Sequence, residues 1–120
     1  MRTVADILLE VASVPDFYDH EVGSVHYRSG YGDTPLHIVA NWGDCEAIKL
    51  LVEAGAEIDA RGESGFTPLH CAAEQNHAEA ASLLLALGAK ILENDHGETP
   101  LILAEAVGSE EVLKVFRNGS

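Results

Sequence analysis

Apolar residues recur along this chain at the spacing of short amphipathic helices. The first such stripe contains Val4, Ile7, Leu8 and Val11. Because residues three and four apart share one face of a helix, the stripe predicts a helix over residues 1–13. Pro15 should end this helix, since proline disfavours helical geometry at the residue before it, Val14.

Three further pairs of short helices follow, each with glycine or asparagine between its two members. The predicted pairs cover residues 34–42 and 45–54, 67–75 and 78–87, and 99–107 and 110–117. The separating residues are Gly43, Asn76 and Gly108. Glycine, and after it asparagine, best tolerates the left-handed backbone conformation that ends a helix. The chain is therefore predicted to form a series of helical hairpins.

Each pair opens with the same tripeptide, Thr-Pro-Leu. It begins at Thr34, Thr67 and Thr99, at intervals of 33 and 32 residues. Threonine can cap the helix by accepting a hydrogen bond from an early helical amide. Proline then falls at the first helical position, where its fixed φ helps and its missing N–H is not needed. A unit of this length that occurs three times indicates a repeat architecture.

The repeated unit resembles the ankyrin repeat. It reads Thr-Pro-Leu-His, a first helix, Gly or Asn, a second helix with Leu-Leu, and then Gly-Ala at residues 55–56 and 88–89. The resemblance implies an all-α solenoid of stacked helix-turn-helix units with protruding turns. It also implies a non-enzymatic module that binds another protein.

The same resemblance divides residues 1–120, a single ankyrin-repeat domain, into four parts. Residues 32–64 and 65–96 match as repeats 1 and 2, residues 97–117 match as a C-terminal capping repeat, and residues 1–31 form a degenerate N-terminal cap with a loop insertion. The segment 14–31 departs from the repeat pattern. Alternating side chains at residues 25–27 suggest a short strand there.

His37 and His70 occupy equivalent places in two repeats, which suggests a structural task. We expect each of them to tie the start of its helix to the adjacent turn by hydrogen bonding. The third repeat departs from this pattern, because Ile102 replaces the histidine. The connection that leads to Thr99 is also one residue shorter than the one that leads to Thr67, which leaves the shape of that turn open.

On the family's pattern, the ends of the first helices and the tips of the turns face a binding groove. The candidate protein-binding residues are Tyr31, Asp33, Asn41, Trp42, Glu63, Ser64, Phe66, Glu74, Gln75, His96 and Glu98. Trp42 is the only tryptophan, and aromatic anchors dominate the energy of protein interfaces. The alternative is that Trp42 packs on the insertion 14–31. The acids would give the binding surface an acidic rim.

The chain is strongly acidic, with 20 acidic and 7 basic residues and a net charge of −13 over 120 residues. Such a field repels nucleic acids and anionic membranes and speeds encounter with basic partners. Two interpretations stay open. The acidity keeps a small protein soluble, or it serves an immunity or inhibitor protein that masks a basic toxin or enzyme.

Other features exclude several classes of protein. Cys45 and Cys71 lack a metal or disulfide spacing, so we expect reduced thiols in a reducing compartment. No stretch approaches the ~20 apolar residues of a membrane span, and Asp6 and Glu10 interrupt the apolar N-terminus. A cytoplasmic monomer is therefore predicted.

No motif of the chain indicates catalysis or a cofactor. His70 and Cys71 are adjacent, so on a helix their side chains would point roughly 100° apart. A loose set of possible metal ligands occurs at Asp16, Asp19, His20, Glu21 and His26, without an established ligand spacing. We therefore predict no catalytic, cofactor or metal site, with a metal-binding or enzymatic role of residues 15–31 as a remote alternative.

Overall fold

The computed structural model describes residues 2–13, 25–26, 28–30 and 32–117, and their regular secondary structure is entirely helical. The α-helices are α1 (Val4–Ala12), α2 (Pro35–Trp42), α3 (Cys45–Glu53), α4 (Pro68–Glu74), α5 (Ala78–Ala86), α6 (Pro100–Val107) and α7 (Glu110–Arg117). A single turn of 3₁₀ helix spans Glu63–Gly65. The predicted all-α class is confirmed.

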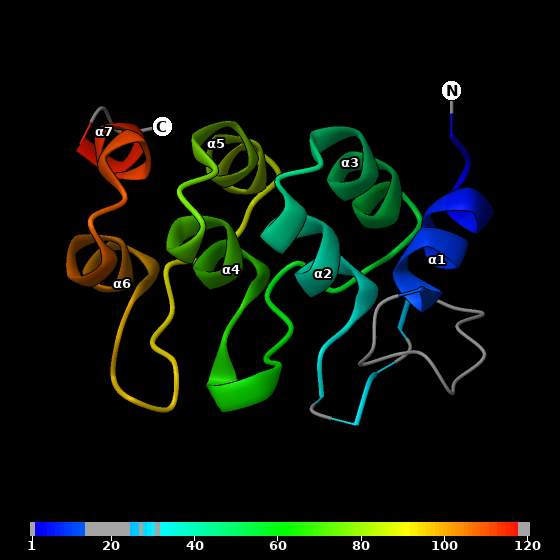
Figure 1. Cartoon of the computed structure of the whole chain (residues 1–120), viewed down its shortest axis with the longest axis horizontal. Helices are drawn as coiled ribbons and strands as arrows, with labels where there is room; N and C mark the ends of the chain where they lie inside the picture. The colour runs from blue at the N-terminus through cyan, green and yellow to red at the C-terminus, as the bar shows by residue number, and fades with distance from the viewer. Residues whose placement is uncertain (1, 14–24, 27, 31, 118–120) are drawn as a thin grey trace.

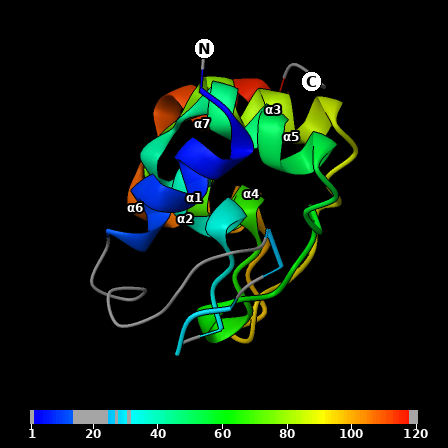
Figure 2. The same ribbon diagram turned by 90° about the vertical axis from the view of Figure 1, so that its right-hand side faces the viewer.

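The helices form two layers (Figure 1). Helices α2, α4 and α6 pack side by side in one layer, and α3, α5 and α7 do so in the other. Helix α1 packs on α2 and α3 at one end of the stack. Long hairpin loops precede α4 and α6 and project to the same side of the molecule (Figures 1 and 2). The predicted solenoid with protruding turns is therefore confirmed.

The helices begin and end where the local sequence predicts. The hydroxyl oxygen of Thr67 accepts a hydrogen bond from the amide of His70 at 3.3 Å, and that of Thr99 accepts one from the amide of Ile102 at 3.2 Å. Left-handed residues separate the paired helices: Gly43 (φ 72°), Asn76 (φ 58°) and Gly108 (φ 76°). Local chemistry therefore fixes the length of each helix.

The core lies between the two layers. Leu36 and Leu69 from one layer and Leu51 and Leu84 from the other are completely buried. Burying one leucine side chain contributes roughly 1.5–3 kcal/mol to stability. Small buried residues allow the first helices to approach closely: Ala40, Ala72, Ala73 and Ala104. No helix pair could bury these faces alone, so the units stabilise one another.

The hairpin loops share one closing hydrogen bond. In each loop the amide of the first residue donates to the carbonyl of the fourth residue after it, at 2.8 Å. The closing pairs are Ser29 and Asp33, Gly62 and Phe66, and Asn94 and Glu98. The shortened connection to Thr99 therefore keeps the same tip. Its missing residue lies before the tip, between Gly88 and Asn94.

An ionic cluster attaches α1 to the first helix pair. The guanidinium of Arg2 contacts Asp44 at 2.6 Å, Glu46 at 2.8 Å and Glu10 at 3.0 Å. Asp44 also accepts a hydrogen bond from the amide of Ala47 and so caps α3. One cation thus holds together a carboxylate of α1 and two at the start of α3.

The strand suggested at residues 25–27 is wrong for the two described residues. Val25 and His26 form a turn, and Val25 is buried in the core. The side chain of Val25 is buried by packing into the helical core, so its apolar character does not require a strand. Tyr27 and most of the insertion 14–31 lie outside the described residues.

Candidate functional site

Two buried histidines connect successive units. The Nδ1 atom of His37 accepts a hydrogen bond from the Thr34 amide at 3.0 Å, so its Nε2–H is free to donate to the carbonyl of Phe66 at 2.8 Å. His70 repeats the arrangement with the Thr67 amide at 3.1 Å and the carbonyl of Glu98 at 2.8 Å. The expected structural task is confirmed: each ring ties a helix start to the next hairpin.

The rings are held in the neutral state that this geometry requires. Burial lowers the pKa of both His37 and His70, because an imidazolium ion would lose its hydration. Hydrogen bonds to the carbonyls of Phe66 and Glu98 oppose this shift without cancelling it. A ring that is fully engaged with backbone groups on both nitrogens has no nitrogen left for catalysis.

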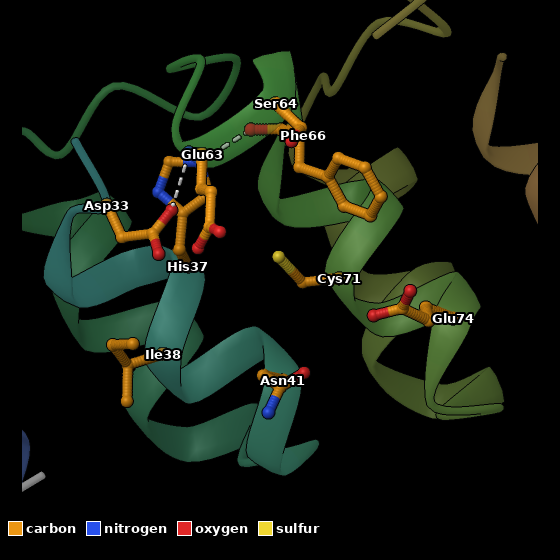
Figure 3. Close-up of a pocket in the computed structure, with 9 residues that line it drawn as sticks. All are labelled: Asp33, His37, Ile38, Asn41, Glu63, Ser64, Phe66, Cys71 and Glu74. Atoms are coloured by element: carbon orange, nitrogen blue, oxygen red, sulfur yellow. Dashed lines mark hydrogen bonds between the residues drawn. The ribbon is translucent and has the colours of Figure 1, made fainter. Parts of the chain in front are cut away.

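A groove opens between α2, α4 and the hairpin loop that joins their units (Figure 3). Its volume is about 350 Å³. We define the groove by its lining residues, which are Asp33, His37, Ile38, Asn41, Glu63, Ser64, Phe66, Cys71 and Glu74. Two repeats and one hairpin loop therefore build it together.

The groove brings together six of the eleven residues that the sequence proposed for protein binding: Asp33, Asn41, Glu63, Ser64, Phe66 and Glu74. Four others lie outside its lining. Trp42 is 40% exposed at the end of α2, Gln75 is exposed after α4, His96 is exposed in the third hairpin, and Glu98 is half-buried below it. Tyr31 lies outside the described residues.

Sequence reasoning missed three lining residues: His37, Ile38 and Cys71. The sequence spacing could have indicated two of them, Ile38 and Cys71. Ile38 precedes Asn41 by three residues, and Cys71 precedes Glu74 by three. Residues three apart on a helix are neighbours on its surface, so the proposed residues at the helix ends also pointed to these two.

The hairpin tip is fixed by contacts across the two units. A carboxylate oxygen of Asp33 accepts a hydrogen bond from the amide of Glu63 at 3.0 Å. Gly62 lies against this contact, because a Cβ atom there would overlap the Asp33 carboxylate and approach the His37 Nε2 atom to 2.9 Å. The Phe66 ring stacks at a tilt on the His70 ring, with 5.3 Å between centroids. The groove wall is therefore preorganised.

The groove has an acidic rim and an apolar part of its lining. Among the described residues that line it, the charged ones are Asp33, Glu63 and Glu74, and none is a lysine or arginine. Ile38, Phe66 and Cys71 supply the apolar surface. Figure 3 shows the Phe66 ring overhanging α4 above Cys71 and Glu74. Such a surface can bind an apolar or cationic group of a partner.

Neither metal nor thiol chemistry finds support in the described part of the chain. Among those residues no group of three or more His, Cys, Asp or Glu side chains could hold a metal ion. Of the loose set of possible ligands, only His26 is described. Cys45 and Cys71 are free thiols, and burial raises the pKa of both, which disfavours the reactive thiolate. No described helix is long and apolar enough to cross a membrane.

Comparison with known proteins agrees with the geometry. A family model described as "Ankyrin repeats (3 copies)" matches residues 3–95 and 36–119. No curated protein matches the chain. The matched ranges include every α-helix of the structure, so the resemblance inferred from the repeated motif is confirmed.

Proposed function

Because the chain belongs to the ankyrin repeat family, we propose that it binds a protein partner through the groove and the neighbouring hairpin tips. Ankyrin repeats are generally protein–protein interaction modules and typically not enzymes. The observation that carries the proposal is the gathering of six proposed binding residues, from two repeats, around one groove. We also propose the division into an N-terminal cap at 1–31, repeats at 32–64 and 65–96, and a capping repeat at 97–117.

The side chains of the groove support this proposal because the scaffold does not need most of them. Asn41, Glu63 and Glu74 are exposed, and their side chains form no hydrogen bond or ion pair with another described residue. Phe66 contributes its backbone carbonyl to His37, whereas its ring faces the groove. A rigid aromatic ring beside exposed polar groups is a common arrangement at the centre of an interface.

Affinity capture tests the proposal. The immobilised chain is incubated with a lysate of the source cells, and bound proteins are identified by mass spectrometry. We expect Phe66→Ala to lose the partner and Leu9→Ala to retain it, because Leu9 is 73% exposed on α1, away from the groove. Both variants keep the backbone contacts of the hairpins. A partner that both variants retain equally would place binding outside the groove and reject the proposal.

A second candidate function is masking of a basic toxin or enzyme by an immunity or inhibitor protein. The net charge of −13 favours it, because opposite charge accelerates association. We expect a captured partner to be basic, to dissociate more readily at high salt and to lose activity when bound. Trp42→Ala tests whether this exposed aromatic residue extends the interface beyond the groove. Binding to an acidic partner, or binding insensitive to salt, contradicts electrostatic masking.

A further inference from the structure

We propose that the groove receives an arginine side chain of the partner, with its guanidinium between Glu63 and Glu74 and over the Phe66 ring. This inference rests on the proposed protein-binding function and specifies what the groove recognises. It follows from the charge of the rim, the chemistry of the apolar lining and the size of the groove.

The described residues that line the groove include no lysine or arginine. One Asp33 oxygen accepts a hydrogen bond from the Glu63 amide, but no described residue forms a hydrogen bond or ion pair with the carboxylate of Glu63 or of Glu74. The nearby Arg28 donates instead to the carbonyls of Gly32 and Arg61. An acidic or neutral occupant would desolvate these carboxylates without compensating them, whereas a cation would form charge-assisted hydrogen bonds.

The apolar lining of the groove favours an organic cation over a metal ion. Ile38, Phe66 and Cys71 offer apolar surface to the occupant. A calcium ion needs about six to eight oxygen ligands, and the described residues contain no cluster that could hold a metal. The alkyl stem of arginine can cover apolar side chains, and its planar guanidinium stacks on an aromatic ring and pairs with carboxylates.

The size of the groove fits a side chain better than a whole helix. Its volume of about 350 Å³ lies at the lower end of the roughly 300–1,000 Å³ range of ligand pockets. Lysine has the same charge, but its compact ammonium cannot form two parallel hydrogen bonds in one plane. We therefore commit to arginine.

Titration with short peptides tests the inference without knowledge of the partner. The probes are acetyl-Gly-Arg-Gly-amide, its lysine counterpart and its citrulline counterpart, which keeps the shape of arginine without the charge. Two-dimensional amide NMR spectra at low salt report binding. We expect saturable shifts at Ser64, Phe66 and Cys71 with the arginine peptide, and binding weaker by about tenfold or more with citrulline. Equal affinity for citrulline, tighter binding of lysine, or no saturable shift at these three amides overturns the proposal.

A charge-matched pair of variants separates the groove from the general field of the protein. The Glu63→Gln/Glu74→Gln double variant should lose about tenfold or more of the arginine-peptide affinity. The Glu53→Gln/Glu79→Gln control removes the same charge from exposed sites on α3 and α5 and should lose less than about twofold. The spectra also verify that both variants fold. Equal losses in the two variants reject a specific site.

Affinity capture separates failure of this inference from failure of the proposed function. A partner that Phe66→Ala loses but Glu63→Gln/Glu74→Gln retains would reject the arginine site and leave the protein-binding function standing. A partner that both variants lose, together with arginine-peptide binding at the groove, supports both.

Discussion

The junction between α2 and α4 and the junction between α4 and α6 share a scaffold but differ in their surfaces. A buried histidine donates to the next hairpin in both, at 2.8 Å to the carbonyl of Phe66 and of Glu98. The positions that face the groove differ. Phe66 and Glu74 line the groove at the first junction, and the equivalent positions at the second junction are Glu98 and Ala106. The repeat therefore fixes the backbone and leaves these surface positions to determine what is bound.

The largest expected effect comes from breaking the shared contact. In His37→Ala the Thr34 amide and the Phe66 carbonyl lose their partner and a cavity opens, so we expect a loss of about 2–4 kcal/mol in stability. Ile102→Ala is the matched control, because Ile102 occupies the equivalent position in the third unit and is 46% exposed. It should cost less than about 1 kcal/mol. Urea denaturation measures both, and equal losses would show that the histidine bridge contributes little.

Acid should weaken both junctions in the same way. The pKa values of His37 and His70 are lowered from 6.5 in the folded chain, so below pH 6.5 the unfolded chain binds more protons. The histidine contribution is complete above pH 6.5 and is lost as the pH falls, by up to about 1.4 kcal/mol per pH unit for each ring. Charged neighbours have opposing effects on these pKa values. Asp33 raises and Arg28 lowers the pKa of His37, and Glu98 raises and Arg61 lowers the pKa of His70.

Denaturation between pH 7 and pH 5 measures this dependence, above the range in which most carboxylates titrate. His70→Asn should have the shallower slope, because it removes one of the two rings. A stability that does not change across this range, or a variant with the same slope as the wild type, contradicts the assignment of neutral bridging histidines.

A smaller effect is expected where the two junctions differ in the connection between paired helices. The side chain of Asn76 accepts hydrogen bonds from the amides of Glu111 and Val112 and so caps α7 from the neighbouring unit. Gly43 stands at the equivalent place, and there the ring of His77 lies where a side chain would project. Asn76→Gly keeps the left-handed backbone and should cost about 1 kcal/mol.

The reciprocal change Gly43→Asn sharpens this comparison. A Cβ atom at Gly43 would lie 2.6 Å from the His77 ring, and the Nε2–H of that ring donates to the Asn41 carbonyl at 2.9 Å. The ring must move, so the substitution should destabilise the chain although asparagine suits this backbone at position 76. Thermal unfolding of both variants decides the matter, and a neutral Gly43→Asn would show that the His77 contact is dispensable.

Local rules explain how much of this structure the sequence could predict. Thr67 and Pro68 start a helix and Gly43 ends one through contacts within a few residues, so the helices were predictable. The groove was predictable in part, because the resemblance indicates which helix ends and turn tips face a partner. Its depth depends on packing between units, and Ile38 and Cys71 were therefore missed.

Long-range contacts were the least predictable feature. The cluster of Arg2 with Asp44 and Glu46 joins residues more than 40 positions apart, and no periodic pattern marks it. The strand suggested at residues 25–27 failed for the opposite reason. A short alternating pattern carries no information about the core that Val25 enters.

The smallest expected effect distinguishes groove residues from scaffold residues most directly. Glu74 is the last residue of α4, where a carboxylate meets the negative end of the helix dipole. Glu74→Gln should therefore raise stability by about 0.3 kcal/mol, whereas Glu110→Gln at the start of α7 should lower it by a similar amount. Chemical denaturation at low salt, with replicates, resolves the opposite signs. A destabilising Glu74→Gln would show that the carboxylate contributes to the stability of the scaffold. A stabilising Glu74→Gln would show that the helix is more stable without this charge, as expected of a residue whose role is to bind a partner.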